Sequence, residues 1–155
     1  MRTTITASTI FVALTTVGIT PIAGQPQWAE RALDNGATEF RLSNDEGASI
    51  ILVCATQGLS AGFEFPTALE FTERASVRGI PGERQNIPVA PLGDRMLQIA
   101  GGRGLDFTLG LLREAANLSV RAGGARASFE VFGSGSTVAE CVGLIEDPTQ
   151  NPTRR

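Results

Sequence analysis

The sequence of 155 residues contains no histidine, no lysine and no tyrosine. Without histidine, the chain lacks the usual base of serine and cysteine hydrolases and a common ligand of zinc, copper and haem iron. Without lysine, it lacks the amine that forms Schiff bases and the lysine that binds phosphate in P-loops. Acidic residues and cysteines remain for proton chemistry, since arginines stay protonated. We therefore expect a protein that is not an enzyme and that holds no metal and no cofactor.

The N-terminal residues resemble an export signal in their layout. Arg2 gives a short positive start, residues 5–19 contain no charge, and Pro21 ends this run before the small residues of Ile22-Ala23-Gly24. This pattern predicts a secretory signal peptide over residues 1–24, and the run is too short and too weakly apolar for a membrane span. An uncleaved amphiphilic N-terminal helix is the alternative. We expect a periplasmic or secreted protein.

The remainder of the chain has the size of one domain, which we place at residues 25–147. Residues 148–155 have nothing to bury, and we expect a disordered tail there. The whole chain has a net charge of −3. An acidic balance argues against general nucleic-acid binding and against adhesion to anionic lipid. The expected partner is another envelope protein or an anionic envelope component, with no nucleic acid and no stable membrane span after cleavage.

Both cysteines lie in the part of the chain that would be exported. Cys54 follows the apolar run at residues 49–53, and Cys141 lies in the last predicted helix. An even cysteine count behind an export signal is typical of a disulfide, and this one would stabilise the fold by about 4 kcal/mol. A redox or nucleophilic thiol is the alternative, but the chain has no C-x-x-C spacing and no histidine partner.

Hydrophobic periodicity predicts an α+β domain, with an antiparallel sheet and two helices in the C-terminal half. Residues 28–33 favour a short opening helix. Asp106 could cap a helix from Phe107 to about Asn117, and Ser134 or Ser136 could cap a final helix. Pro88 would have to lie on an edge strand or outside a ladder. Strands are predicted at 39–42, 49–54, 59–65, 69–78, 87–89 and 96–99, followed by a hairpin of 118–121 and 126–132 across Gly123-Gly124.

One stretch of motifs resembles a group of small bacterial envelope proteins. The motifs are Leu52-Val53-Cys54, a hydrophobic helix at 107–116, the Phe-rich run at 127–134 and finally Cys141. The sequence is similar in this respect to periplasmic accessory proteins associated with type VI secretion. The resemblance implies a periplasmic, non-catalytic helper fold and transfers no functional residue.

Three groups of residues are candidates for a functional site. Two of the three carboxylates Glu64, Glu70 and Glu73 could act together as in a glycoside hydrolase. The alternative is that they are polar residues on the solvent-exposed face of a strand. The glycine-rich segment 101–104 precedes a predicted helix and could bind an anion, although it could equally be a simple turn.

The third group is a concentration of arginines, because residues 74–103 contain only Glu83 and Asp94 as acids. Such a segment could bind an acidic partner through bidentate contacts. Arginine stems also commonly cover apolar surface, which is the structural alternative. The candidate binding residues are Arg74, Arg78, Arg84, Arg95 and Arg103.

These observations lead to one main functional hypothesis and two alternatives. The main hypothesis is an exported, non-catalytic binding or accessory protein of the bacterial cell envelope, with a role in secretion. One alternative is a small carboxylate-dependent hydrolase. The other is an inhibitor of an envelope enzyme that inserts an exposed loop such as residues 79–82 into the enzyme's cleft.

Overall fold

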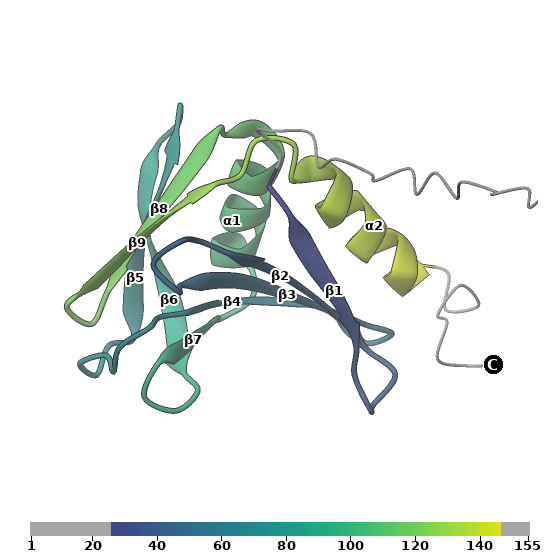
Figure 1. Cartoon of the computed structure of the whole chain (residues 1–155), viewed down its shortest axis with the longest axis horizontal. Coiled ribbons are helices and arrows are strands. Elements are labelled where there is room, and N and C mark those ends of the chain that lie inside the picture. Colours follow the sequence, from purple (N-terminus) through teal and green to yellow (C-terminus); the bar gives the residue numbers. More distant parts are fainter. Residues whose placement is uncertain (1–25, 147–155) are drawn as a thin grey trace, which may run out of the picture.

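The computed structural model describes residues 26–146, which form one nine-stranded antiparallel sheet and two helices (Figure 1). The strand order across the sheet is β1-β2-β3-β4-β7-β6-β5-β8-β9. The predicted α+β class, with one disulfide and both helices in the C-terminal half, is confirmed. The elements are β1 (Trp28–Ala32), β2 (Thr38–Ser43), β3 (Ser49–Ala55), β4 (Gly58–Glu64), β5 (Arg74–Ile80), β6 (Arg84–Pro91), β7 (Met96–Ile99), α1 (Arg103–Glu114), β8 (Asn117–Ala122), β9 (Ala125–Glu130) and α2 (Gly135–Glu146).

Strand β6 joins the two halves of the sheet. Its first part, up to Pro88, pairs with β5, and its last part, from Val89, pairs with β7. Proline has no N–H to donate, so it is tolerated where a ladder ends. Pro88 lies just beyond the last β6–β7 pair, Val89 with Ile99, and is the last residue of β6 that pairs with β5, opposite Arg74, so the predicted edge position or position outside a ladder is wrong. The two halves meet at an angle, and both helices lie within that angle (Figure 1).

Alternating strand residues point into this angle and form the core. Leu52, Phe63 and Val77 are fully buried there, and Leu112 joins them from α1. Helix α1 packs on β5 and β6 and also contacts α2. Its close approach needs a glycine in β5, because a Cβ at Gly79 would lie 2.5 Å from the Leu111 side chain. Helix α2 packs on β3 and β4.

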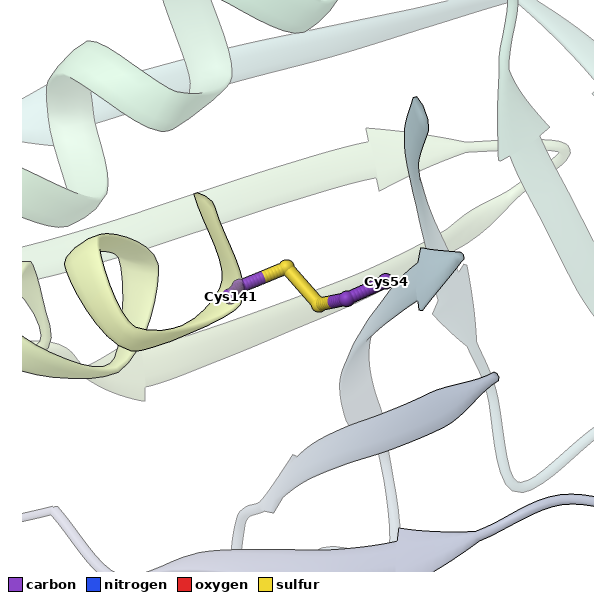
Figure 2. The surroundings of a disulfide bond; sticks show 2 residues. All are labelled: Cys54 and Cys141. Atoms are coloured by element: carbon purple, nitrogen blue, oxygen red, sulfur yellow. A yellow bond between two sulfur atoms is a disulfide. The ribbon is translucent and has the colours of Figure 1, made fainter. Parts of the chain in front are cut away.

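The disulfide joins the end of β3 to the middle of α2, as Figure 2 shows. Cys54 and Cys141 are bonded, with their Cα atoms 5.5 Å apart. Both residues are buried in the core. The bridge therefore ties the last helix to the sheet from inside.

Trp28 makes a second long-range contact to the start of α2. Its indole N–H donates a 3.0 Å hydrogen bond to the hydroxyl oxygen of the fully buried Ser134. Ser134 stands directly before α2, and its carbonyl accepts the first helical bond, from Val138. The predicted N-terminal position of Ser134 is confirmed. Its hydroxyl, however, accepts the hydrogen bond from β1.

Two predictions of secondary structure are wrong: the type of the first element and the start of the predicted strand 69–78. The segment predicted as an opening helix is strand β1, in which Trp28 pairs with Leu42 of β2. The predicted strand 69–78 begins only at Arg74, because the preceding loop has other hydrogen-bond partners: the amide of Leu69 bonds to Asp94 and that of Glu70 to Gly123. Phe71 in this loop is 82% exposed.

The first helix also begins earlier than predicted. It starts at Arg103 with Gly102 at the N-cap position, and Asp106 lies within its first turn instead of capping it. It ends at Glu114, not at Asn117, because Asn117 already belongs to β8.

The remaining predicted strands, the hairpin and the final helix are found as expected. The predicted signal peptide and tail lie outside the described residues. No helix within residues 26–146 combines the length and the hydrophobicity needed to cross a bilayer.

Candidate functional site

The outer face of strand β5 is polar, while its inner face belongs to the core. Ala75, Val77 and Gly79 are buried under α1, whereas Arg74 and Arg78 are exposed on the opposite face. This alternation follows from the pleat of a strand, which directs successive side chains to opposite sides. Arg74 and Arg78 therefore share the outer face of β5.

The strand register places further arginines on the same face. Arg78 stands directly opposite Arg84 of β6. One row further along the sheet, Ser76 of β5 stands opposite Arg121 of β8, and Arg121 in turn stands opposite Arg126 of β9. We call this surface the arginine face. Small polar residues such as Ser76 and Ser119 lie between its arginines. These arginines are Arg74, Arg78, Arg84, Arg121 and Arg126.

The arginine face has very little negative charge. Glu130 is the one acidic residue that β5, β6, β8 and β9 place on this side of the sheet. Within residues 26–146, none of the five face arginines has a carboxylate oxygen within 4.0 Å, although Arg31, Arg41 and Arg95 elsewhere all do. One guanidinium, that of Arg74, donates to the backbone carbonyl of Asn86 at 3.2 Å.

Two like-charged cross-strand pairs stand out on this face, Arg78 with Arg84 and Arg121 with Arg126. The Cβ atoms of directly opposite residues lie about 5 Å apart, and like charges at that spacing destabilise a sheet. A bound anion would relieve the repulsion by accepting hydrogen bonds from both guanidinium groups. The arrangement is therefore suited to an anionic partner.

The structure separates two of the predicted binding residues from the others. Arg95 lies in the loop before β7, 4.0 Å from Asp94. Arg103 is the first residue of α1, the helix that packs on the inner face of the same strands. Conversely, Arg121 and Arg126 were not among the predicted binding residues. The predicted hairpin across Gly123-Gly124 already placed these two opposite one another, so the signal was present.

The carboxylates proposed for hydrolysis have unrelated environments. Glu64 forms an ion pair with Arg41, which also binds Glu39 at 3.3 Å. Burial alone would lower the pKa of Arg41, but hydrogen bonds to Glu64 and Glu39 and their charges raise it above its ordinary value. The Arg41 side chain thus stays charged and bridges from β2 to β4, across Ile51 of β3, which is 2% exposed.

The other two carboxylates are exposed in the segment before β5. Glu70 lies beside the Gly123-Gly124 turn, and the carbonyl of Glu73 accepts a hydrogen bond from Val89. Neither shares a partner with Glu64. This arrangement gives no support to a carboxylate pair acting on one bond.

The glycine-rich segment before α1 has a packing role. Gly102 has a φ of 64°, a conformation that favours glycine. A Cβ at Gly104 would lie 3.1 Å from the Ile87 side chain, so the missing side chain lets the first turn of α1 approach β6. Asp106 places a negative charge in that first turn. These observations favour a simple turn at residues 101–104 over an anion-binding site.

Comparison with known proteins gives a fold relationship. No protein-family model matches the chain. No curated protein matches it either. Among solved structures, the fold is similar to the crystal structure of invasion associated protein B from Bartonella henselae, with a TM-score of 0.59 and 11% sequence identity. The match covers 79% of this chain and 96% of that chain. At this identity, the similarity shows the fold alone.

Proposed function

We propose that the protein is an exported, non-catalytic accessory protein of the bacterial cell envelope that binds an anionic partner through the arginine face. The observation on which this proposal rests is the pairing of Arg78 with Arg84 and of Arg121 with Arg126, without carboxylate partners among the described residues. Guanidinium groups bind carboxylates and phosphates in bidentate geometry, so each pair can hold one anionic group.

Export is supported by the disulfide. Structural disulfides persist in oxidising compartments and are rare in the reducing cytosol of most organisms. The Cys54–Cys141 bridge is consistent with a mature protein in the periplasm or outside the cell. A role in secretion, which the resemblance to periplasmic accessory proteins implies, is part of the proposal.

The residues of the face also favour binding over catalysis. The face presents mainly arginines and short polar residues, together with Ile80, Pro88, Ala90 and Glu130. It includes no nucleophile with an adjacent base, and histidine is absent from the chain. A surface of this kind gains affinity and association rate from electrostatic complementarity.

The test is a charge-matched comparison of two double variants. Arg78→Gln/Arg84→Gln removes one like-charged pair from the face, and Arg95→Gln/Arg103→Gln removes the same charge elsewhere. The probe is fluorescently labelled polyglutamate, with binding followed by anisotropy at low and moderate salt. We expect the face variant to lose roughly tenfold or more in affinity, because charge-assisted hydrogen bonds are lost, and the control to lose about twofold or less.

Thermal melting distinguishes binding from packing in the same pair of variants. Because the two arginines repel one another, their removal should leave the melting temperature unchanged or raise it. Equal affinity losses in both variants would contradict a specific face. A marked drop in melting temperature confined to Arg78→Gln/Arg84→Gln would show that these side chains serve packing instead.

The inhibitor hypothesis concerns the turn between β5 and β6. Gly79 and Ile80 are the last residues of β5, residues 81–83 connect it to β6, and Ile80 is 48% exposed. The turn lies at one end of the arginine face, beside Arg78. The turn is an alternative contact for a partner.

A further inference from the structure

Strand β9 forms one edge of the sheet, and its outer edge is largely unpaired. The two-residue turn Gly123-Gly124 joins Ala122 to Ala125, so these two form a hydrogen-bonded pair with β8. In an antiparallel ladder such pairs alternate with non-bonded ones. The N–H and C=O groups of Arg126, Ser128 and Glu130 therefore point away from β8, towards the free edge.

A side-chain contact agrees with this orientation. The amide Nδ2 of Asn44, in the turn between β2 and β3, donates a 3.0 Å hydrogen bond to the carbonyl of Ser128. The Oδ1 of Asn44 accepts hydrogen bonds from the amides of Glu46 and Ala48, which fixes the side chain. Asn44 thus occupies one edge group in the way that the backbone of a neighbouring strand would. The edge groups of Arg126 and Glu130 have no partner within residues 26–146.

A cleft of about 600 Å³ lies along this edge. One wall is β9 from Arg126 to Glu130, a length of about 14 Å that matches a five-residue strand. The opposite wall includes Asp45 and Glu46 of the β2–β3 turn. With Glu130, the lining contains three carboxylates against the single guanidinium of Arg126. The cleft is therefore acidic, although the neighbouring outer face of the sheet is basic.

We propose that this cleft binds an extended, basic segment of a partner protein, which adds to the sheet as a strand beside β9. Strand addition satisfies the edge groups of Arg126, Ser128 and Glu130, and the incoming backbone replaces the single amide of Asn44. Basic side chains on the segment would pair with Asp45 and Glu46. The inference rests on the backbone edge of β9 and on the carboxylates of the β2–β3 turn, which the arginine face does not use, although Arg126 and Glu130 border both surfaces.

The central variant removes one edge donor without changing the rest of the wall. Proline is tolerated on an edge strand where its missing N–H faces outward, so Ser128→Pro keeps β9 but cannot pair with a new strand. Ser128→Ala is the matched control, because it loses the hydroxyl and keeps the N–H. Both variants are made in the full chain.

The probes are two labelled nonapeptides of alternating threonine and valine, one flanked by arginines and the other by glutamates. We expect Ser128→Pro to bind the arginine peptide roughly tenfold more weakly than the wild type and Ser128→Ala do, and all three proteins to bind the glutamate peptide equally, because that peptide is attracted to the arginine face and not to the edge. Hydrogen exchange on the unmodified protein gives an independent readout. The amides of Arg126, Ser128 and Glu130 should exchange fast in the free protein and slow down in the presence of the arginine peptide.

Several outcomes would overturn the proposal. Undiminished binding by Ser128→Pro, or no slowing of exchange at the three edge amides, would show that the edge does not pair. Self-association is another such outcome, since pairing of two β9 strands about Ser128 would place Arg126 opposite Glu130. A concentration-dependent dimer in light scattering, abolished by Ser128→Pro, would assign the edge to a second copy of the chain. Slower exchange of the three edge amides with the glutamate peptide and not with the arginine peptide would contradict an acidic cleft, whereas glutamate-peptide binding without that slowing belongs to the arginine face.

Discussion

Reduction of the Cys54–Cys141 bridge should remove a large part of the stability of the domain. The bridge closes a loop with a sequence separation of 87 residues. In the chain-entropy model, releasing a loop of this length destabilises the folded state by about 4.5 kcal/mol. A domain of this size has a free energy of unfolding of roughly 5–15 kcal/mol, so the reduced protein would be only marginally stable.

The assay is equilibrium unfolding in urea with and without a phosphine reductant, followed by circular dichroism. With an m-value of about 2 kcal/mol per molar urea, the midpoint should fall by about 2 M on reduction. The m-value itself should rise, because the reduced unfolded chain is less compact. Cys54→Ala/Cys141→Ala in the absence of reductant is the control, and should match the reduced wild type to within about 1 kcal/mol. A midpoint that falls by less than about 0.5 M would refute the loop argument.

Three further variants test individual packing contacts. Trp28→Phe removes the donor to buried Ser134 and should cost about 1–3 kcal/mol in urea unfolding; a loss within error would show that the contact between β1 and α2 is unimportant. Gly79→Ala should destabilise by about 1–3 kcal/mol, because its Cβ would collide with Leu111, and a neutral result would contradict the close approach of α1. Gly110→Ala has nothing within 4 Å of its new Cβ and should raise the stability by about 0.5–1 kcal/mol, a gain detectable as a higher midpoint.

Strands were predicted correctly from the sequence where the local residue pattern and the final burial agree. Residues 49–54 form a continuous apolar run, and they become β3, a strand buried on both faces. Alanine, glutamate and arginine in residues 28–33 favour a helix locally. Pairing with β2, which places Trp28 opposite Leu42, overrides that propensity. Pairing between strands cannot be detected from the residues of one short segment of sequence.

Alternation alone could not show where β5 begins. The alternating pattern extends back to Leu69, but the amides of Leu69 and Glu70 bond to the carbonyls of Asp94 and Gly123, which lie in a loop and a turn. The start of α1 was missed for a different reason. Glycine is a weak helix former, but the position of Gly104 against Ile87 requires the absence of a side chain. Both corrections depend on tertiary contacts.

The candidate site was predicted in part. Arg74 and Arg78 could be assigned to one face from the period of two along a strand. Their association with Arg121 and Arg126 depends on the pairing of β5 with β8, two strands distant in sequence. That pairing follows from the sheet order and cannot be derived from the arginines themselves.

The most direct test of export and of the bridge is peptide mapping of the protein recovered from its native compartment. Untagged protein from the cell-envelope fraction is denatured and alkylated without reduction, then digested and examined by mass spectrometry. We predict that peptides from residues 1–24 are absent and that the peptide containing Cys54 is cross-linked to the one containing Cys141. Alkylation of both cysteines in this material would contradict an exported, disulfide-bonded domain.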